Sequence, residues 1–227
     1  FQLLIMLRRS NSPPYSRYFG RERKRQAKNR PKIRYNAPSF HGTGYQHMEL
    51  IDIGCNLTHD TFDHDRSEVI ARAREAGIVQ MVITGASEEG SKLALELARK
   101  DPGELFATAG VHPHHAADYT DQTDALLREL SHQPEVVAVG ETGLDYFRDF
   151  SPRDVQREVF ARQLRIGTDS AKPVFLHMRE AHRDFYSILR EHRDELGDVV
   201  VHCFTGSRDE LKAYLDLDCH IGITGWI

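Results

Sequence analysis

Cysteine and long apolar runs are both scarce in this sequence of 227 residues. Its three cysteines (Cys55, Cys203 and Cys219) are an odd number without Cys-x-x-Cys spacing, which argues against a disulfide scaffold. A reducing cytosol fits better, and we expect a cytoplasmic protein. No apolar run approaches the roughly 18 residues that a transmembrane helix needs, so we expect no membrane partner. The 40% hydrophobic and 28% charged residues are ordinary for a globular chain.

Three familiar motifs are absent as well. No Gly-x-Gly-x-x-Gly follows the first apolar run, which argues against a dinucleotide-binding fold. The sequence has no P-loop and no Gly-x-Ser-x-Gly elbow, so neither a nucleotide triphosphate site nor a Ser/His/Asp hydrolase is indicated. Any chemistry must therefore depend on other side chains.

The net charge of −4 combines two segments of opposite sign. Residues 1–47 carry 11 Lys/Arg and a single acid, Glu22, whereas residues 48–227 carry 19 basic and 33 acidic residues, a balance of −14. The basic segment has no hydrophobic periodicity, and we predict that it is disordered. A nucleic-acid-binding arm, an organelle transit peptide and non-native sequence all fit its composition. We favour the last, because the chain begins with Phe1 and Met48 directly precedes the first predicted strand.

From Met48 onward, short apolar runs rich in Val and Ile alternate with amphipathic stretches. This alternation predicts βαβ units and a parallel sheet with about seven strands and six helices, as in doubly wound sheets and (β/α)8 barrels. The predicted strands are Leu50–Ile53, Ile78–Ile83, Leu105–Ala109, Val136–Val139, Val174–Leu176, Val199–Val201 and Ile221–Ile223.

Four successive predicted strand ends carry residues that bind metals. His112 follows the third strand and Glu141 the fourth, while His177 and His202 end the fifth and sixth. In both parallel folds, working residues gather at the carboxyl ends of the strands. One such histidine alone could equally be a satisfied polar group, but four residues on one face favour a metal site. Imidazole and carboxylate ligands suit Zn²⁺ or Mn²⁺, and carboxylates suit Mg²⁺.

Six motifs, in order and spacing, make residues 48–227 resemble the TatD family of metal-dependent nucleases. They are DIGCNLT (52–58), GVHPH (110–114), GETGLD (140–145), PVFLH (173–177), HCFTG (202–206) and IGITGW (221–226). The resemblance implies a TIM barrel of the amidohydrolase type. It also implies a Mg²⁺-stimulated 3′→5′ exonuclease acting on single strands of DNA, and on RNA, in DNA repair or turnover. One or two divalent ions are implied, with Mn²⁺ or Zn²⁺ as alternatives.

The resemblance also implies roles for individual residues. Glu141 matches the bridging metal ligand and is a catalytic candidate, and His177 and His202 match further ligands. His112 matches a residue that contacts the phosphate or lies beside the metal, and is the other catalytic candidate. Asp145 matches a supporting position, although a structural salt bridge fits it equally well. The substrate-binding candidates are His112, Asn56, Arg179 and Thr205.

The sequence departs from the family pattern in two places. Many relatives carry His-x-His at the end of the first strand, where this chain has Gly54 and Asn56, a form that one branch of the family shares. We expect one metal position to be weak or rich in water. The family also has an eighth strand that ends in a metal-ligating Asp. Because the chain stops at Ile227, we expect a fragment whose first and seventh strands are unpaired.

Two other functions stay open from the sequence. A metal-dependent hydrolase of a small amide, ester or lactone would use the same barrel. An inactive, truncated remnant is the third reading. The acidic body opposes binding of a polyanion, so cations and local arginines must reverse the field at the pocket. The sequence does not fix the oligomeric state, and a monomer is favoured.

Overall fold

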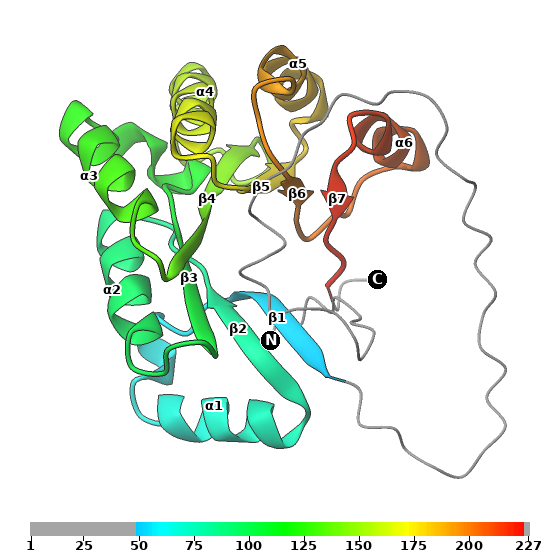
Figure 1. The fold of residues 1–227 in the computed structure, drawn as a ribbon. Helices are drawn as coiled ribbons and strands as arrows, with labels where there is room; N and C mark the ends of the chain where they lie inside the picture. The colour runs from blue at the N-terminus through cyan, green and yellow to red at the C-terminus, as the bar shows by residue number, and fades with distance from the viewer. Residues whose placement is uncertain (1–48, 225–227) are drawn as a thin grey trace, which may run out of the picture.

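The computed structural model describes residues 49–224, so the basic leader predicted at residues 1–47 and its boundary at Met48 lie outside the described residues, as do residues 225–227. Seven parallel strands pair in chain order in one sheet. The sheet curls into a half-barrel with the helices along its outer side (Figure 1). This arrangement confirms the predicted incomplete TIM-type barrel. The strands are β1 (Leu50–Cys55), β2 (Ile78–Ile83), β3 (Leu105–Ala109), β4 (Val136–Asp145), β5 (Val174–Arg179), β6 (Val199–Val201) and β7 (His220–Ile221).

Six α-helices connect these strands, together with two short 3₁₀ helices. Local signals set their starts: the Ser87 side chain accepts a hydrogen bond from the backbone of Gly90, and Ser207 and Glu210 form a capping box. No helix within residues 49–224 combines the length and apolar character needed to cross a membrane. The helices are α1 (Arg66–Glu75), α2 (Glu88–Ala98), α3 (Asp121–Ser131), α4 (Arg153–Ser170), α5 (His182–His192), α6 (Arg208–Asp216), η2 (Asp60–Phe62) and η3 (Pro113–Asp118).

Two apolar clusters hold the sheet. The larger one packs the helices against the strands and includes the fully buried Phe160, Leu164 and Leu176. The smaller cluster contains Ile51, Ile53, Val82, Ala138 and Phe175. Phe175 precedes His177 by two residues, so both side chains lie on the same face of β5. The smaller cluster therefore lies directly below the predicted metal ligands. Within the described part of the chain, the sheet order leaves β1 and β7 at its two edges.

Four of the predicted strands have different bounds in the structure, beginning with β1, which runs to Cys55 rather than ending at Ile53. β4 runs to Asp145 rather than ending at Val139, and β5 continues past Leu176 to Arg179. The added residues pair with each other, since Thr142–Asp145 lie opposite Leu176–Arg179. The apolar pattern stops early because polar residues and glycine interrupt it in these extensions, where only Leu144 and Met178 are apolar and buried. The last strand is His220–Ile221 and not Ile221–Ile223.

Candidate metal and active site

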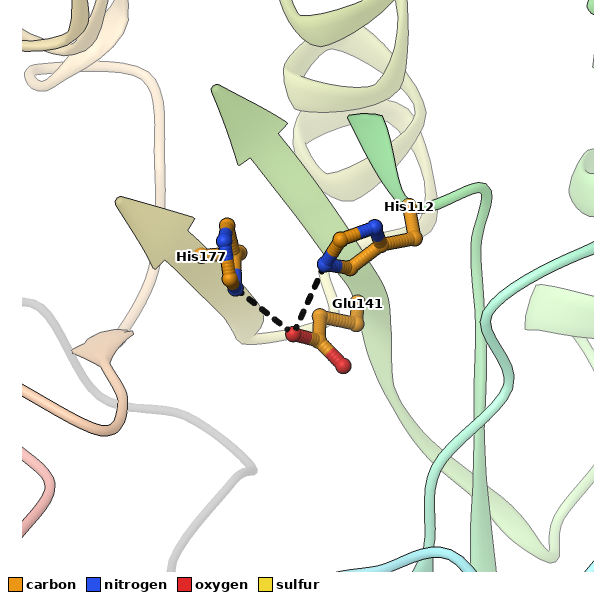
Figure 2. Close-up of side chains that lie close together, drawn as sticks. All are labelled: His112, Glu141 and His177. Carbon is orange, nitrogen blue, oxygen red and sulfur yellow. Dashed lines mark hydrogen bonds and ion pairs between the residues drawn. The ribbon is translucent and has the colours of Figure 1, made fainter. Parts of the chain in front are cut away.

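Three imidazole rings meet at one carboxylate oxygen, Oε1 of Glu141. His202 Nε2 lies 2.6 Å from this oxygen, His177 Nδ1 3.0 Å and His112 Nε2 3.4 Å. Figure 2 shows the rings of His112 and His177 turned toward the carboxylate. Glu141 projects from β4 and His177 from β5, His202 directly follows β6, and His112 follows β3 at the start of η3. Four neighbouring strands thus deliver these side chains to one point.

A second carboxylate, Asp145, extends the cluster. It lies four residues beyond Glu141, on the same face of β4. Its Oδ2 is 3.2 Å from Nε2 of His177 and 2.8 Å from Nε2 of His114. Its Oδ1 accepts hydrogen bonds from the backbone N–H groups of Phe147 and Arg148. The even spacing of Glu141 and Asp145 in GETGLD predicts that both face the site, whereas no pattern in the sequence predicts a role for His114.

The two carboxylates strongly perturb the charges of the histidines. Burial alone lowers the pKa of His177, but hydrogen bonds with Asp145 and Glu141 raise that pKa to about 9. Burial would raise the pKa of Glu141, yet the charge of His202 and the hydrogen bond from His177 hold it well below its usual range. Burial lowers the pKa of His112 to about 3, so this ring is neutral at pH 7. The cluster therefore holds two ionised acids around a protonated imidazole.

The donor set fits a divalent cation. His112, Glu141 and His177 each offer a ligand atom within 4.8 Å of the others, and His202 approaches the same oxygen of Glu141. Imidazole nitrogens and a carboxylate oxygen are ligands that Zn²⁺ and Mn²⁺ accept. The pair of acids around protonated His177 also shows that positive charge is stabilised here. Cys203 does not join the donors, because its Sγ contacts the Thr224 hydroxyl at 3.3 Å.

The other substrate-binding candidates lie outside this cluster. Asn56 follows β1, Thr205 follows His202, and both are exposed. Arg179 ends β5, and its guanidinium packs over the ring of Phe147 instead of turning to Glu141. Within residues 49–224, none of the three side chains forms a hydrogen bond or an ion pair with the cluster. Their roles stay predictions.

Packing explains why Gly54 stands where many relatives carry the first histidine of His-x-His. A Cβ atom at Gly54 would lie 3.1 Å from the ring of Phe175. That ring stacks on His202 with centroids 4.5 Å apart. The space into which a side chain at position 54 would project is therefore filled by the aromatic support of His202.

The fold and the site define a class of protein, the hydrolases that carry metal-binding residues at the carboxyl ends of a parallel barrel-type sheet. Comparison with known families gives the family itself. The profile of the family "TatD related DNase" matches residues 51–227. The chain belongs to this family of hydrolytic nucleases.

Curated relatives and solved structures agree with this assignment. A "3'-5' ssDNA/RNA exonuclease TatD" from Erwinia tasmaniensis is 49% identical over 178 residues, which cover 78% of this chain and 69% of the relative. The protein with the same name from Musicola paradisiaca is 47% identical, with 78% and 67% covered. A TatD homologue from Escherichia coli superposes with a TM-score of 0.69 at 29% identity, covering 75% of this chain and 66% of that structure. The chain thus spans about two thirds of the length of these relatives.

Proposed function

We propose that this chain is a metal-dependent exonuclease that hydrolyses phosphodiester bonds at the 3′ ends of single-stranded DNA and RNA. The convergence of three imidazoles on the Glu141 carboxylate, at the carboxyl edge of the sheet, carries this proposal. The similarity to proteins named as 3'-5' ssDNA/RNA exonucleases supports the polarity and the substrate class. The chain spans about two thirds of those relatives, so its activity has to be measured on the chain itself.

Glu141, His177 and His202 would hold the cation, with Mg²⁺ as the first candidate and Mn²⁺ or Zn²⁺ as the alternatives. When bound, such an ion activates a water molecule and stabilises the charge that develops on the phosphate. Asp145 would position a ligand: it accepts the Nε2–H of His177, so that Nδ1, which faces Glu141, would coordinate the ion once this nitrogen has given up its proton.

His112 is better suited to the phosphate than to the metal. Its Nδ1 accepts a hydrogen bond from the backbone N–H of His114 at 3.2 Å, so the proton of the neutral ring lies on Nε2. This Nε2–H faces the Glu141 carboxylate and can donate to a phosphate oxygen bound at the same place. Asn56 follows β1, Arg179 ends β5 and Thr205 follows β6, all at the carboxyl edge of the sheet, and we propose them as further contacts to the nucleotide.

The test is cleavage of a 5′-labelled single-stranded oligonucleotide by the whole chain with Mg²⁺, Mn²⁺ or Zn²⁺. We expect stepwise shortening from the 3′ end, loss of activity with a chelator, and at least a hundredfold lower rate for Glu141→Gln. Glu96→Gln, an exposed acid on α2, is the matched control and should keep the wild-type rate. Hydrolysis of small esters, amides or lactones without cleavage of the oligonucleotide would contradict the proposal.

A further inference from the structure

The loop between β4 and α4 carries two exposed phenyl rings. Phe147 is 51% exposed and Phe150 66% exposed, and no other Phe or Tyr side chain within residues 49–224 is this open. The ring of Phe150 packs against His114, with centroids 4.8 Å apart, so it supports the cluster. Phe147 has no aromatic partner among the described residues, and an apolar ring displayed at a site in this way indicates a binding surface.

Phe147 lies just beyond the end of β4, next to the metal-ligand cluster. It follows Asp145 by two residues, just as Arg179 follows His177 by two residues on β5. Asp145 and Arg179 are register partners in the sheet. From the sheet outward the order is therefore His177, then the paired Asp145 and Arg179, and then Phe147 in the loop that follows β4.

Two arginines surround the Phe147 ring. The guanidinium carbon of Arg179 lies 4.8 Å from the ring centroid and that of Arg148 lies 5.8 Å from it. Both arginines are exposed, and neither forms an ion pair with a residue of the described part of the chain. Arg153, a few residues away, differs because it pairs with Asp149. In an acidic body, two unpaired guanidinium groups against one open ring are complementary to a flat base flanked by phosphates.

We propose that Phe147 is the stacking platform for an unpaired base near the 3′ end of a single strand, and that Arg148 and Arg179 bind the adjacent phosphates. The proposal rests on the proposed nuclease function and explains why the substrate must be single-stranded. A base in a duplex is already stacked and paired, whereas an unpaired base offers a free face to the ring. Because every base has such a face, the platform accepts any sequence.

The first measurement is binding of a fluorescent single-stranded oligonucleotide by anisotropy, with a chelator present so that nothing is cleaved. Phe147→Leu keeps an apolar side chain but removes the flat ring, and we expect about tenfold weaker binding, equal to about 1.4 kcal/mol. Phe147→Tyr restores the ring and should restore the affinity. Leu215→Ala changes an apolar side chain that is 54% exposed on α6, and should bind like the wild type.

The second measurement identifies the base. Oligonucleotides with one abasic nucleotide, placed in turn at each of the last four positions, are bound to the wild type and to Phe147→Leu. At one position the missing base should weaken the wild type about tenfold and leave Phe147→Leu unchanged, because the ring and the base report the same contact. If Phe147→Leu binds as well as the wild type, or loses the same factor at all four positions, the platform does not exist.

The salt dependence of binding distinguishes the contribution of the Phe147 ring from that of the two arginines. Replacing Arg148 with Ala should lower the slope of log K against log salt by about 0.7, because one phosphate contact is lost, whereas Phe147→Leu should leave the slope unchanged. Hydrolysis is measured in parallel. A wild type that neither binds nor cleaves the oligonucleotides refutes the nuclease function and the platform together. A wild type that cleaves, with Phe147→Leu equal to it in binding, refutes the platform alone.

Discussion

Gly143 lies on β4 directly against the backbone of β5. Its φ of +148° falls in a region that favours glycine, and an added Cβ would lie 1.9 Å from the carbonyl oxygen of His177. Gly143→Ala should therefore force the two strands apart and displace a metal-ligand candidate. We expect a loss of about 3 kcal/mol in the free energy of unfolding, measured by urea denaturation.

Two other glycines provide controls for that substitution. Gly103 also has a positive φ, +89°, but nothing lies within 4 Å of its added Cβ, and Gly197 has open space without the positive φ. Gly103→Ala should cost about 1 kcal/mol from backbone strain alone, and Gly197→Ala should be nearly neutral. Equal losses at positions 143 and 103 would show that close approach of the strands contributes nothing.

Thr142 and Thr108 are both buried, but only the hydroxyl of Thr108 has a hydrogen-bond partner among the described residues. Each residue is 1% exposed, but the Thr142 hydroxyl has no hydrogen-bond partner within residues 49–224, whereas the Thr108 hydroxyl accepts from the backbone N–H of Gly85 at 3.0 Å. Thr142→Val should stabilise the fold by about 1 kcal/mol, and Thr108→Val should destabilise it by about as much. Thermal and urea unfolding of both variants test the difference. A shift of the same sign in both would contradict it.

At the scale of elements, α3 and α4 are joined by an ionic network centred on Asp124. Its carboxylate is 2.7 Å from Arg128 Nε and 3.2 Å from Arg162 Nε, and Tyr119 donates a hydrogen bond to it. Burial would raise the pKa of Asp124, but the hydrogen bonds from Arg128 and Tyr119 bring it below its usual value. Folding therefore favours the ionised form of this carboxyl.

Because folding lowers the pKa of Asp124, the stability of the protein depends on pH. The contribution of Asp124 is fully present above the unfolded pKa, near pH 4, and is lost as the pH falls through the lower folded-state pKa. Asp124→Asn should cost about 2 kcal/mol at pH 7, and its difference from the wild type should shrink below about pH 4. Asp169→Asn removes a more exposed partner of Arg128 and should cost less than about 1 kcal/mol. A pH-independent deficit in Asp124→Asn would contradict this account.

The elements also show which features the sequence could predict. The apolar runs predicted all seven strands, because strands buried on both faces need continuous aliphatic side chains. The same signal missed the outer half of β4, where Glu141, Gly143 and Asp145 occupy alternate positions that serve the site and not the core. Strand order brought His112, Glu141, His177 and His202 together as predicted. The contact between His114 and Asp145 spans 31 residues and depends on the course of η3, which no periodicity encodes.

At the scale of the whole molecule, the ion pairs that neutralise its many acidic side chains are not spread evenly over the surface. Several arginines on the outer helices pair with neighbouring acids, as Arg74 does with Glu104 and Arg128 with Asp169. At the carboxyl edge of the sheet, Arg148 and Arg179 form no ion pair within the described residues. Their guanidinium groups place positive charge at the edge where a polyanionic substrate would approach the cluster. A divalent cation held at Glu141 would add positive charge at the same edge.

Such a cation would also stabilise the molecule as a unit, because the cluster joins β3, β4, β5 and β6. A ligand that binds only the folded state adds about 2.7 kcal/mol when its concentration is a hundred times the dissociation constant. We expect the melting temperature of the wild type and of Glu96→Gln to rise with the logarithm of the Mn²⁺ or Mg²⁺ concentration and to fall back when a chelator is added. Glu141→Gln and His202→Ala should show little or no rise. An equal rise in Glu141→Gln would locate the bound ion away from this cluster.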